Sequence, residues 1–392
     1  MSTRSVASLQ NPIMRGVRLS GERQPQVRRG VHLPEGLLMV SADSHWEISR
    51  DIFYERFPER LRDKAPRVWF DRYWHIGYPG VLESYGTPSP ALDEALARTV
   101  PSGVWDMTLR RTHMDAEGVQ KEIAFPQSLL GFMRYQDLEV QEWLYRIYNE
   151  HIAECSNQSA GRFNGVGICS NWWDPRRARQ AISQIVQLGL KTFLLPVSPG
   201  KDPGGKELNY ADPQMDPLWK AAADAGLPVN FHVGENALIQ QGRGALGTYM
   251  MTALAPFRKP FGQLVFGGVF DRYPDLKVVF TEGGISWIAP ALQDAEMVYD
   301  TFCSLLDPLL LHRPSDYWHR NCYATFQNDR LGLESLRYIG ADRVMWANDY
   351  PHTEGSFGYT WSSIESVLDT VESPDDARMI LGGTAAQLYQ LN

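Results

Sequence analysis

Four short pieces of this chain carry acids and imidazoles, and each piece comes at the end of an apolar run. The pieces are Asp43-Ser44-His45, His232, Glu282 and Asp349, which end the runs LLMVSADSH, PVNFHVGE, KVVFTEGG and VMWANDYPH. Acids and imidazoles are uncommon in buried strands, so their position where each run ends needs a reason. Imidazole suits zinc, iron or nickel and carboxylate accepts most hard cations, so the set predicts a divalent-metal site.

Each candidate ligand has a structural alternative. Asp43 and His45 are two residues apart, so on a strand both side chains point to one face; Asp-Ser before a helix is also a common cap. His232, alone on an apolar strand, could be a buried core histidine. Asp349 could belong to a simple turn. Four candidate ligands at three strand ends are much less expected by chance than any one of them.

Three residues are candidates for catalysis. Asp349 would take a proton from metal-bound water, and Glu282 would be a second acid or base, or an extra ligand, if it faces the ion. A carboxylate beside a glycine turn could instead only accept hydrogen bonds from the loop. His352 is a substrate-side candidate in a loop, as are His319 and Arg313. An ordinary loop role is an equal alternative for each.

Other polar and aromatic residues near these pieces have weaker interpretations. Glu47 could hydrogen-bond to a ligating histidine or face solvent. Large aromatic residues either line an apolar pocket or belong to the core; the candidates are Trp46, Trp74, Trp105, Trp172 and Trp173.

From Leu37 onward, strand-like runs alternate with amphipathic helix patterns, which favours repeated βα units. The predicted strands are 37–45, 120–127, 163–170, 192–198, 228–234, 277–284, 322–329 and 344–352. Eight such strands close a parallel (β/α)8 barrel of the TIM type, whose active site lies at the carboxyl ends of the strands. A doubly wound open sheet is the main competitor, but no GxGxxG follows the first strand.

The connections between strands supply helices and two insertions. Asp174-Pro175 and Asp216-Pro217 each predict an N-cap followed by proline in the first turn, with helices closed by Gly189 and Gly226. The stretches 46–118 and 235–258 do not fit the repeat. Insertions after barrel strands lie on the catalytic face, so both are expected to shape the pocket.

Composition excludes several classes. The chain has 392 residues, is 43% hydrophobic and carries a net charge of −8, which argues against nucleic-acid binding. Its apolar runs are too short for a transmembrane helix. The four cysteines show no paired spacing, which favours a reducing cytoplasm. Residues 1–36 form an arginine-rich arm, expected to pack on the body or on a neighbouring subunit, and residues 37–392 form the barrel.

The combination of ADSHWE, NFHVGE, TEGGISW and WANDYPH, with RPSDYW before the seventh strand, resembles the amidohydrolase superfamily. The nearest branch is amidohydrolase family 2, which is similar to aminocarboxymuconate-semialdehyde decarboxylase. RTHMDAEGVQKEIAFPQ, YNEHIAECSNQSAGRF and GADRVMWANDYPH extend the likeness from about residue 37 to the C-terminus. The resemblance implies a distorted barrel, one divalent metal ion and a homodimer.

The resemblance also implies which residues hold the ion. The first-strand pair corresponds to Asp43 and His45, the fifth-strand ligand to His232 and the eighth-strand carboxylate to Asp349. The family pair usually begins with His or Glu rather than Asp. The sixth-strand residue is histidine in the characterised decarboxylases and Glu282 here. Binuclear members use a lysine at the end of the fourth strand; in KTFLLPV only Lys191, at its start, is available, so one metal is expected.

Three functions follow, in this order. The first is a hydrolase that attacks an amide, ester or activated C–C bond of a small cyclic or aromatic substrate with water activated by zinc, or by manganese or iron. The second is a metal-dependent, non-oxidative decarboxylase of an aromatic or unsaturated carboxylic acid. The third is an inactive barrel used for binding. The expected partner is a small molecule, with no nucleic acid and no membrane.

Overall fold

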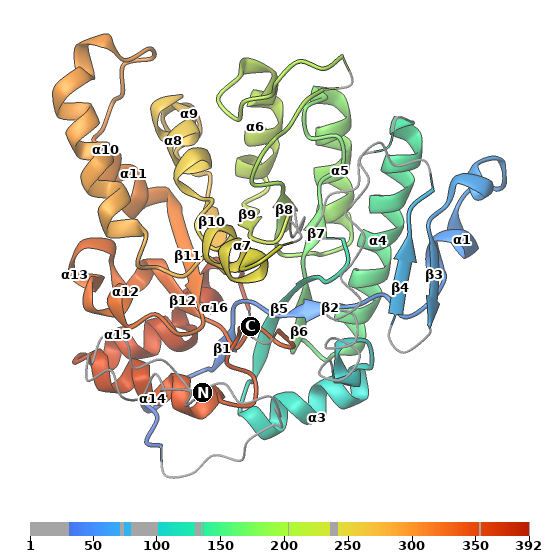
Figure 1. The fold of residues 1–392 in the computed structure, drawn as a ribbon, viewed down its shortest axis with the longest axis horizontal. Coiled ribbons are helices and arrows are strands. Elements are labelled where there is room, and N and C mark those ends of the chain that lie inside the picture. Colours follow the sequence, from blue (N-terminus) through green and yellow to red (C-terminus); the bar gives the residue numbers. More distant parts are fainter. Residues whose placement is uncertain are drawn as a thin grey trace.

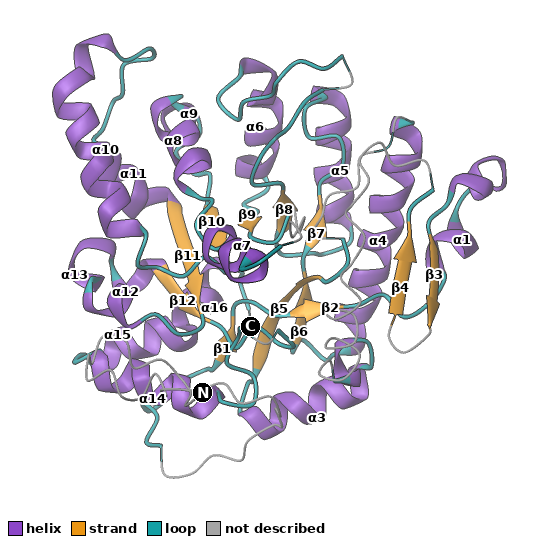
Figure 2. Cartoon of the chain, in the orientation of Figure 1, coloured by secondary structure: helices purple, strands orange, loops and turns teal. Residues whose placement is uncertain are grey.

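The described part of the chain consists of short parallel strands surrounded by helices (Figures 1 and 2). This computed structural model describes residues 31–70, 74–79, 101–129, 135, 137–202, 204–235, 242–352 and 354–391. Most of the predicted N-terminal arm therefore lies outside the described residues. The α/β class predicted from the alternating pattern is confirmed.

Ten parallel strands lie at the centre of the described part of the chain. They are β1 (Val40–Ser41), β2 (His45–Trp46), β5 (Lys121–Pro126), β6 (Phe163–Gly165), β7 (Gly167–Ile168), β8 (Phe193–Leu195), β9 (Val229–His232), β10 (Val278–Thr281), β11 (Cys322–Phe326) and β12 (Val344–Trp346). Six of them pair in the order β12-β11-β10-β9-β8-β7, and β1, β2 and β6 all pair with β5. Most of their residues are buried, as expected for strands covered on both faces.

The two sheets are joined by backbone hydrogen bonds. At one junction, the amide of Val166, between β6 and β7, donates to the carbonyl of Ala124 at 2.9 Å. At the other, the amide of Ala42, just after β1, donates to the carbonyl of Trp346 on β12 at 3.1 Å. The first and last strand segments of the chain are therefore neighbours.

Helices cover the outside of the strands. The α-helices are α1 (Ile52–Arg56), α3 (Met107–Glu117), α4 (Leu138–Gln158), α5 (Pro175–Gln187), α6 (Asp216–Asp224), α7 (Ala245–Ala253), α8 (Arg258–Phe266), α9 (Val269–Arg272), α10 (Ile288–Phe302), α11 (Pro314–Asn321), α12 (Arg330–Glu334), α13 (Leu336–Ile339), α14 (Thr360–Thr370), α15 (Pro374–Arg378) and α16 (Thr384–Leu388). Short 3-10 turns are η3 (Glu59–Lys64), η4 (Ser102–Val104), η5 (Pro213–Met215), η6 (Cys303–Leu305) and η7 (Ala341–Arg343), and η8 (Met379–Gly383) is a π-helical turn.

One of the two predicted helix caps is present. The Asp174 side chain accepts hydrogen bonds from the amides of Arg176 and Arg177 at the start of α5, as predicted. The cap predicted at Asp216 is wrong. The turn η5 runs directly into α6, so Asp216 is already inside the first helical turn and its carboxylate pairs with Arg272.

The eight predicted strand runs all contain strands, but these are shorter than predicted. The first run is divided into β1 and β2, and the third into β6 and β7. The sixth and eighth runs end before Glu282 and Asp349, which have positive φ angles of 71° and 54°. A left-handed residue cannot continue a strand, so both acids turn out of the sheet where it ends.

The described parts of both insertions contain regular structure. Residues 46–118 include α1, α3 and the antiparallel pair β3 (Arg67–Phe70) and β4 (Trp74–Gly77). Residues 235–258 include α7, which is drawn in front of the central strands in Figure 1. Among the described helices, none combines the length and the apolar character that crossing a membrane requires.

Candidate metal centre

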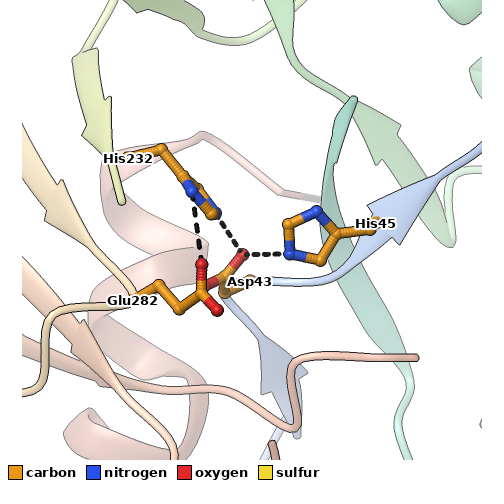
Figure 3. A group of neighbouring side chains, drawn as sticks. All are labelled: Asp43, His45, His232 and Glu282. Atoms are coloured by element: carbon orange, nitrogen blue, oxygen red, sulfur yellow. Dashed lines mark hydrogen bonds and ion pairs between the residues drawn. The ribbon is translucent and has the colours of Figure 1, made fainter. Parts of the chain in front are cut away.

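Side chains from widely separated parts of the sequence meet where the central strands end. Asp43, His45, His232 and Glu282 offer donor atoms that all lie within 4.8 Å of one another (Figure 3). A second, overlapping group with the same property consists of His45, Glu282, Asp349 and His352. All the predicted ligands and catalytic residues therefore lie in one place.

His232 is the last residue of β9, and its ring orientation is set by its own backbone. Nδ1 lies 2.8 Å from the carbonyl oxygen of Val233 and 3.3 Å from Glu282 Oε2. Because a hydrogen-bonded Nδ1 carries the proton, the lone pair is left on Nε2. Nε2 lies 3.2 Å from Asp43 Oδ1, in the middle of the donor group.

His45 joins the two carboxylates that come from opposite ends of the chain. Its Nε2 atom lies 3.1 Å from Asp349 Oδ1 and 3.7 Å from Asp43 Oδ1. All three side chains are completely buried. Asp43 precedes β2 instead of lying on one long strand with His45, so simple strand alternation does not explain why both point into the site.

Glu282 and His352 form the other edge of the cluster. His352 Nδ1 lies 3.3 Å from Glu282 Oε1 and 3.0 Å from Asp349 Oδ1, while its Nε2 lies 3.2 Å from Gln127 Oε1. The imidazole is thus surrounded by oxygen atoms, which favours its protonated form. Its ring also lies 3.9 Å from that of His45.

Burial and mutual charge shift the pKa values of these groups. Burial, and then the negative charge of Asp349, raises the pKa of Asp43 well above its usual range and that of Glu282 to about 8. Burial would also raise the pKa of Asp349, but the charge and hydrogen bond of His352 lower it. Burial would lower the pKa of His352, yet Asp349 and Glu282 raise it well above normal.

The histidines at the centre of the cluster behave differently. Burial lowers the pKa of both His45 and His232, so both imidazoles are neutral near pH 7. Neutral imidazole is the form that binds metal ions. The cluster thus combines two neutral imidazoles with the carboxyl groups of Asp43 and Asp349, which a bound cation would keep ionised.

The donor set fits one divalent ion. Buried polar atoms normally have hydrogen-bond partners. Asp43 Oδ2 and Asp349 Oδ2 are buried and have none among the residues that the structure describes. With His45 and His232, these carboxylates offer nitrogen and oxygen ligands of the kind that zinc, manganese and iron accept.

The two acids with positive φ angles are held by the surrounding backbone. The Asp349 amide donates to the Asp43 carbonyl at 3.1 Å, and the Glu282 amide donates to Thr325 Oγ1 at 2.8 Å. A β-carbon on Gly355 would lie 2.6 Å from the carbonyl oxygen of Asn348 and 2.7 Å from Asp349 Cβ. Strained conformations of this kind are concentrated at functional sites.

A cavity of about 240 Å³ opens beside His232. Its other lining residues are Val197, Ser198, Val233, Gly234, Glu235, Tyr249, Thr252, Ala253 and Pro256. Three of these, Tyr249, Thr252 and Ala253, lie on α7. The second predicted insertion therefore contributes a wall of the cavity.

Several residues with weaker predictions lie elsewhere. Glu47 accepts hydrogen bonds from Ser128 and from the amide of Ile48, and within the described structure it makes no hydrogen bond or ion pair with a site histidine. Arg313, the N-cap residue of α11, forms surface ion pairs with Glu296 and Asp300 of α10.

The other weak candidates also fall outside the cluster. His319 is an exposed residue of α11. None of the five candidate tryptophans belongs to the described lining of the cavity; Trp46 and Trp172 are buried in the core.

Some site residues were not predicted. Gln127 contacts His352, and it directly follows β5, so the rule of polar residues at strand ends would have found it. Tyr249 and Thr252 give no such signal, because α7 belongs to an irregular insertion whose placement no sequence period indicates.

Comparison with known proteins identifies the family of the chain. The amidohydrolase family model matches residues 60–391, and the chain belongs to this family. A curated relative, 2-amino-3-carboxymuconate-6-semialdehyde decarboxylase of Dictyostelium discoideum, is 25% identical over 349 residues, covering 82% of this chain and 91% of that protein.

Solved structures share the fold. An amidohydrolase from Mycobacterium avium subsp. paratuberculosis has a TM-score of 0.70 at 18% identity, with 90% of this chain and 98% of that chain covered. A 5-carboxyvanillate decarboxylase from Novosphingobium aromaticivorans, complexed with manganese and 4-hydroxy-3-methoxy-5-nitrobenzoic acid, has a TM-score of 0.63 at 18% identity, with 94% and 100% covered. These neighbours imply a TIM-type barrel, and the resemblance found in the sequence is confirmed.

Proposed function

We propose that this protein is a divalent-metal-dependent decarboxylase of a small aromatic or unsaturated carboxylic acid. One observation carries the proposal: two neutral imidazoles and buried carboxylates meet within 4.8 Å, in a chain whose curated relative is a decarboxylase. The relatives favour this second hypothesis over hydrolysis, which the sequence placed first. We also infer that the hydrogen bond from the amide of Ala42, just after β1, to the carbonyl of Trp346 on β12 closes a distorted (β/α)8 barrel with insertions after its first and fifth strands.

A single ion would be held by Asp43, His45, His232 and Asp349. When bound, the ion would supply a positive charge that attracts an anionic substrate. Lys191, the only lysine of the fourth strand region, is exposed at its start, which supports one ion instead of two. The manganese in the solved relative supports manganese as well as zinc. A homodimer remains our expectation from the family.

Glu282 would donate the proton that decarboxylation requires. Without a bound ion, burial and then the charge of Asp349 raise the pKa of Glu282 to about 8, so its carboxyl group holds a proton near neutral pH. The proton goes to the ring carbon that bears the carboxylate. The bond between that carbon and the carboxylate then breaks, its electron pair returns to the ring, and carbon dioxide leaves.

His352 and Asp349 would hold this acid in place. The contact between His352 Nδ1 and Glu282 Oε1, at 3.3 Å, fixes the carboxyl group, and the 3.0 Å contact with Asp349 keeps the imidazole protonated. After turnover His352 can return a proton to Glu282. In this role Asp349 is a ligand and charge partner, whereas hydrolysis would require it as a base.

The cavity beside His232 suits a small substrate with one apolar body. Val197, Val233 and Pro256 provide apolar contacts, while Tyr249 and Glu235 supply polar groups. Pockets that select small ligands combine an apolar lining with a few polar groups in this way.

The test is carbon dioxide release by the manganese-loaded protein from 2,6-dihydroxybenzoate and 5-carboxyvanillate, in ordinary and in deuterated water. We expect carbon dioxide and, in deuterated water, one deuterium on the carbon that lost the carboxylate. Asp342→Asn, at an exposed ion pair, is the matched control and should keep full activity. Cleavage of amide or ester substrates without carbon dioxide release from any acid would reject the proposal and restore hydrolysis.

A further inference from the structure

Arg110 is completely buried on α3, outside the ring of strands. A guanidinium group cannot lose its proton in a protein, so its burial is costly unless charges and hydrogen bonds compensate. The contacts that compensate it therefore indicate what the residue does.

Those contacts reach three different segments. Arg110 Nε donates to Glu122 Oε1 on β5 at 2.8 Å, and Nη1 donates to the backbone carbonyl of His45 at 3.1 Å. The centre of the guanidinium lies 3.9 Å from the centroid of the Tyr350 ring, a cation–π contact. Glu122 neutralises the charge, which leaves the other two contacts to fix positions.

The same helix holds Tyr350 at a second point. His113, one turn further along α3, lies with its Nδ1 2.9 Å from the Tyr350 hydroxyl. A β-carbon on Gly103 would collide with that hydroxyl and come within 2.9 Å of His113 Nδ1, so the approach requires glycine there. Tyr350 is thus fixed by both its ring face and its hydroxyl.

Two of the three segments that Arg110 contacts, those of His45 and Tyr350, carry metal-ligand candidates. The amide of His45 donates to the carbonyl of Tyr350 at 2.6 Å, and Ser44 and Tyr350 form an isolated parallel bridge. Tyr350 directly follows Asp349. The side chains of these two segments also meet, because His45 Nε2 and Asp349 Oδ1 lie 3.1 Å apart.

We propose that Arg110 is a positioning residue that fixes His45 and Asp349 relative to each other and thereby sets the affinity and symmetry of the metal site. It acts on His45 through the carbonyl and on Asp349 through the neighbouring Tyr350 ring. This inference rests on the metal site proposed above. The inference concerns Arg110 and Tyr350, whose side chains are not among the proposed metal ligands.

Two variants test it. Arg110→Lys keeps the charge but loses the planar group that spans the two segments. Arg110→Met combined with Glu122→Gln removes both charges, so no buried charge is left unpaired. The measurement is manganese(II) affinity by EPR titration, together with the EPR spectrum of the bound ion. We expect affinity about 10- to 100-fold weaker and a changed spectrum for both.

Arg162→Lys is the matched control. Arg162 also pairs with an acid of α3, Asp115, and donates to the carbonyl of Val119, but it has no contact with the His45 or Tyr350 segments in the described structure. We expect its manganese affinity and spectrum to match the unmodified protein.

Three results decide between the alternatives. Unchanged affinity and spectrum in either folded Arg110 variant, with folding checked by circular dichroism, would overturn the positioning role. So would an equal loss in Arg162→Lys, which would indicate general destabilisation. Failure of the unmodified protein to bind manganese would instead reject the proposed function. If Arg110→Lys does not fold, the result for Arg110→Met combined with Glu122→Gln decides the question.

Discussion

The two sides of the metal centre are positioned in different ways. His232 is the last residue of β9 and Glu282 directly follows β10, and these two strands pair regularly from Val229 opposite Val278 to His232 opposite Thr281. Asp43, His45 and Asp349 instead lie on short segments joined by single hydrogen bonds and one isolated bridge. Strand register brings the backbones of the first side together, whereas the backbones of the second side depend on particular side chains packed behind them. Distant substitutions should therefore disturb the second side more.

The largest effect is expected at Asp349, which contacts His45 and His352 at once. Asp349→Asn keeps the shape of the side chain but removes its charge. Metal binding should therefore weaken, and the pKa of His352 should fall. We expect kcat to fall by about 10³-fold or more, with weaker manganese affinity. Steady-state kinetics and metal titration measure both quantities. Full activity in this variant would remove Asp349 from the centre.

Glu282→Gln tests whether Glu282 acts as a proton donor or as a metal ligand. Glu282 and His232 form the side of the centre that follows regular strand pairing, called here the regular side. If Glu282 is the acid, kcat falls by about 10²- to 10⁴-fold while manganese affinity changes little. Glu296→Gln, at a surface ion pair, is the control and should behave normally. A loss of affinity as large as the loss of rate would show that Glu282 binds the ion.

Gly355→Ala tests the side formed by Asp43, His45 and Asp349, called here the irregular side. The substitution changes none of the side chains that would bind the metal ion. The new β-carbon would lie 2.6 Å from the Asn348 carbonyl oxygen and 2.7 Å from Asp349 Cβ, so Asp349 has to move. We expect a loss of about 1–3 kcal/mol of stability and about tenfold weaker manganese binding. Thermal denaturation and metal titration check this.

The matched control for that substitution is Gly262→Ala in α8, where an added β-carbon meets nothing within 4 Å. Alanine favours a helix over glycine by about 0.5–1 kcal/mol, so this variant should be slightly more stable with unchanged metal binding. Equal manganese affinity in the two variants would contradict the greater sensitivity of the irregular side.

The last prediction concerns stability alone, at Glu47, which directly follows β2. Burial raises its pKa from 4.5 to about 7 in the folded state. The folded protein thus holds this proton more tightly, so the stabilisation is present below pH 4.5 and is lost as pH rises to about 7. Its size is on the order of 3 kcal/mol. Glu47→Gln should flatten the fall in melting temperature over this range; an unchanged slope would refute it.

The sequence predicted the regular side well and the irregular side in part. Apolar runs that end in His232 and Glu282 indicate buried parallel strands whose ends meet, and the structure has both residues there. Asp43 and His45 were expected on one strand, but that run divides into β1 and β2 because its last residues bond to the segment after β12. Such pairing between chain ends leaves no period in the sequence.

Long-range side-chain contacts explain what else could not be predicted. Arg110 and Glu122 read as an ordinary helix charge and an ordinary strand charge, and only the folded structure shows both buried together. Likewise, α7 gives no signal that it lines the cavity. Conversely, Arg313 looked chemically suitable but pairs with acids of α10, because nearness to a strand in sequence does not place a loop residue at the site.

The most direct measurement is anomalous diffraction from a crystal of the protein soaked in manganese(II). We predict one strong peak per chain, coordinated by His45, His232 and at least one carboxylate of Asp43 or Asp349. No peak among these four side chains, or an ion bound only elsewhere, would contradict the proposed metal centre.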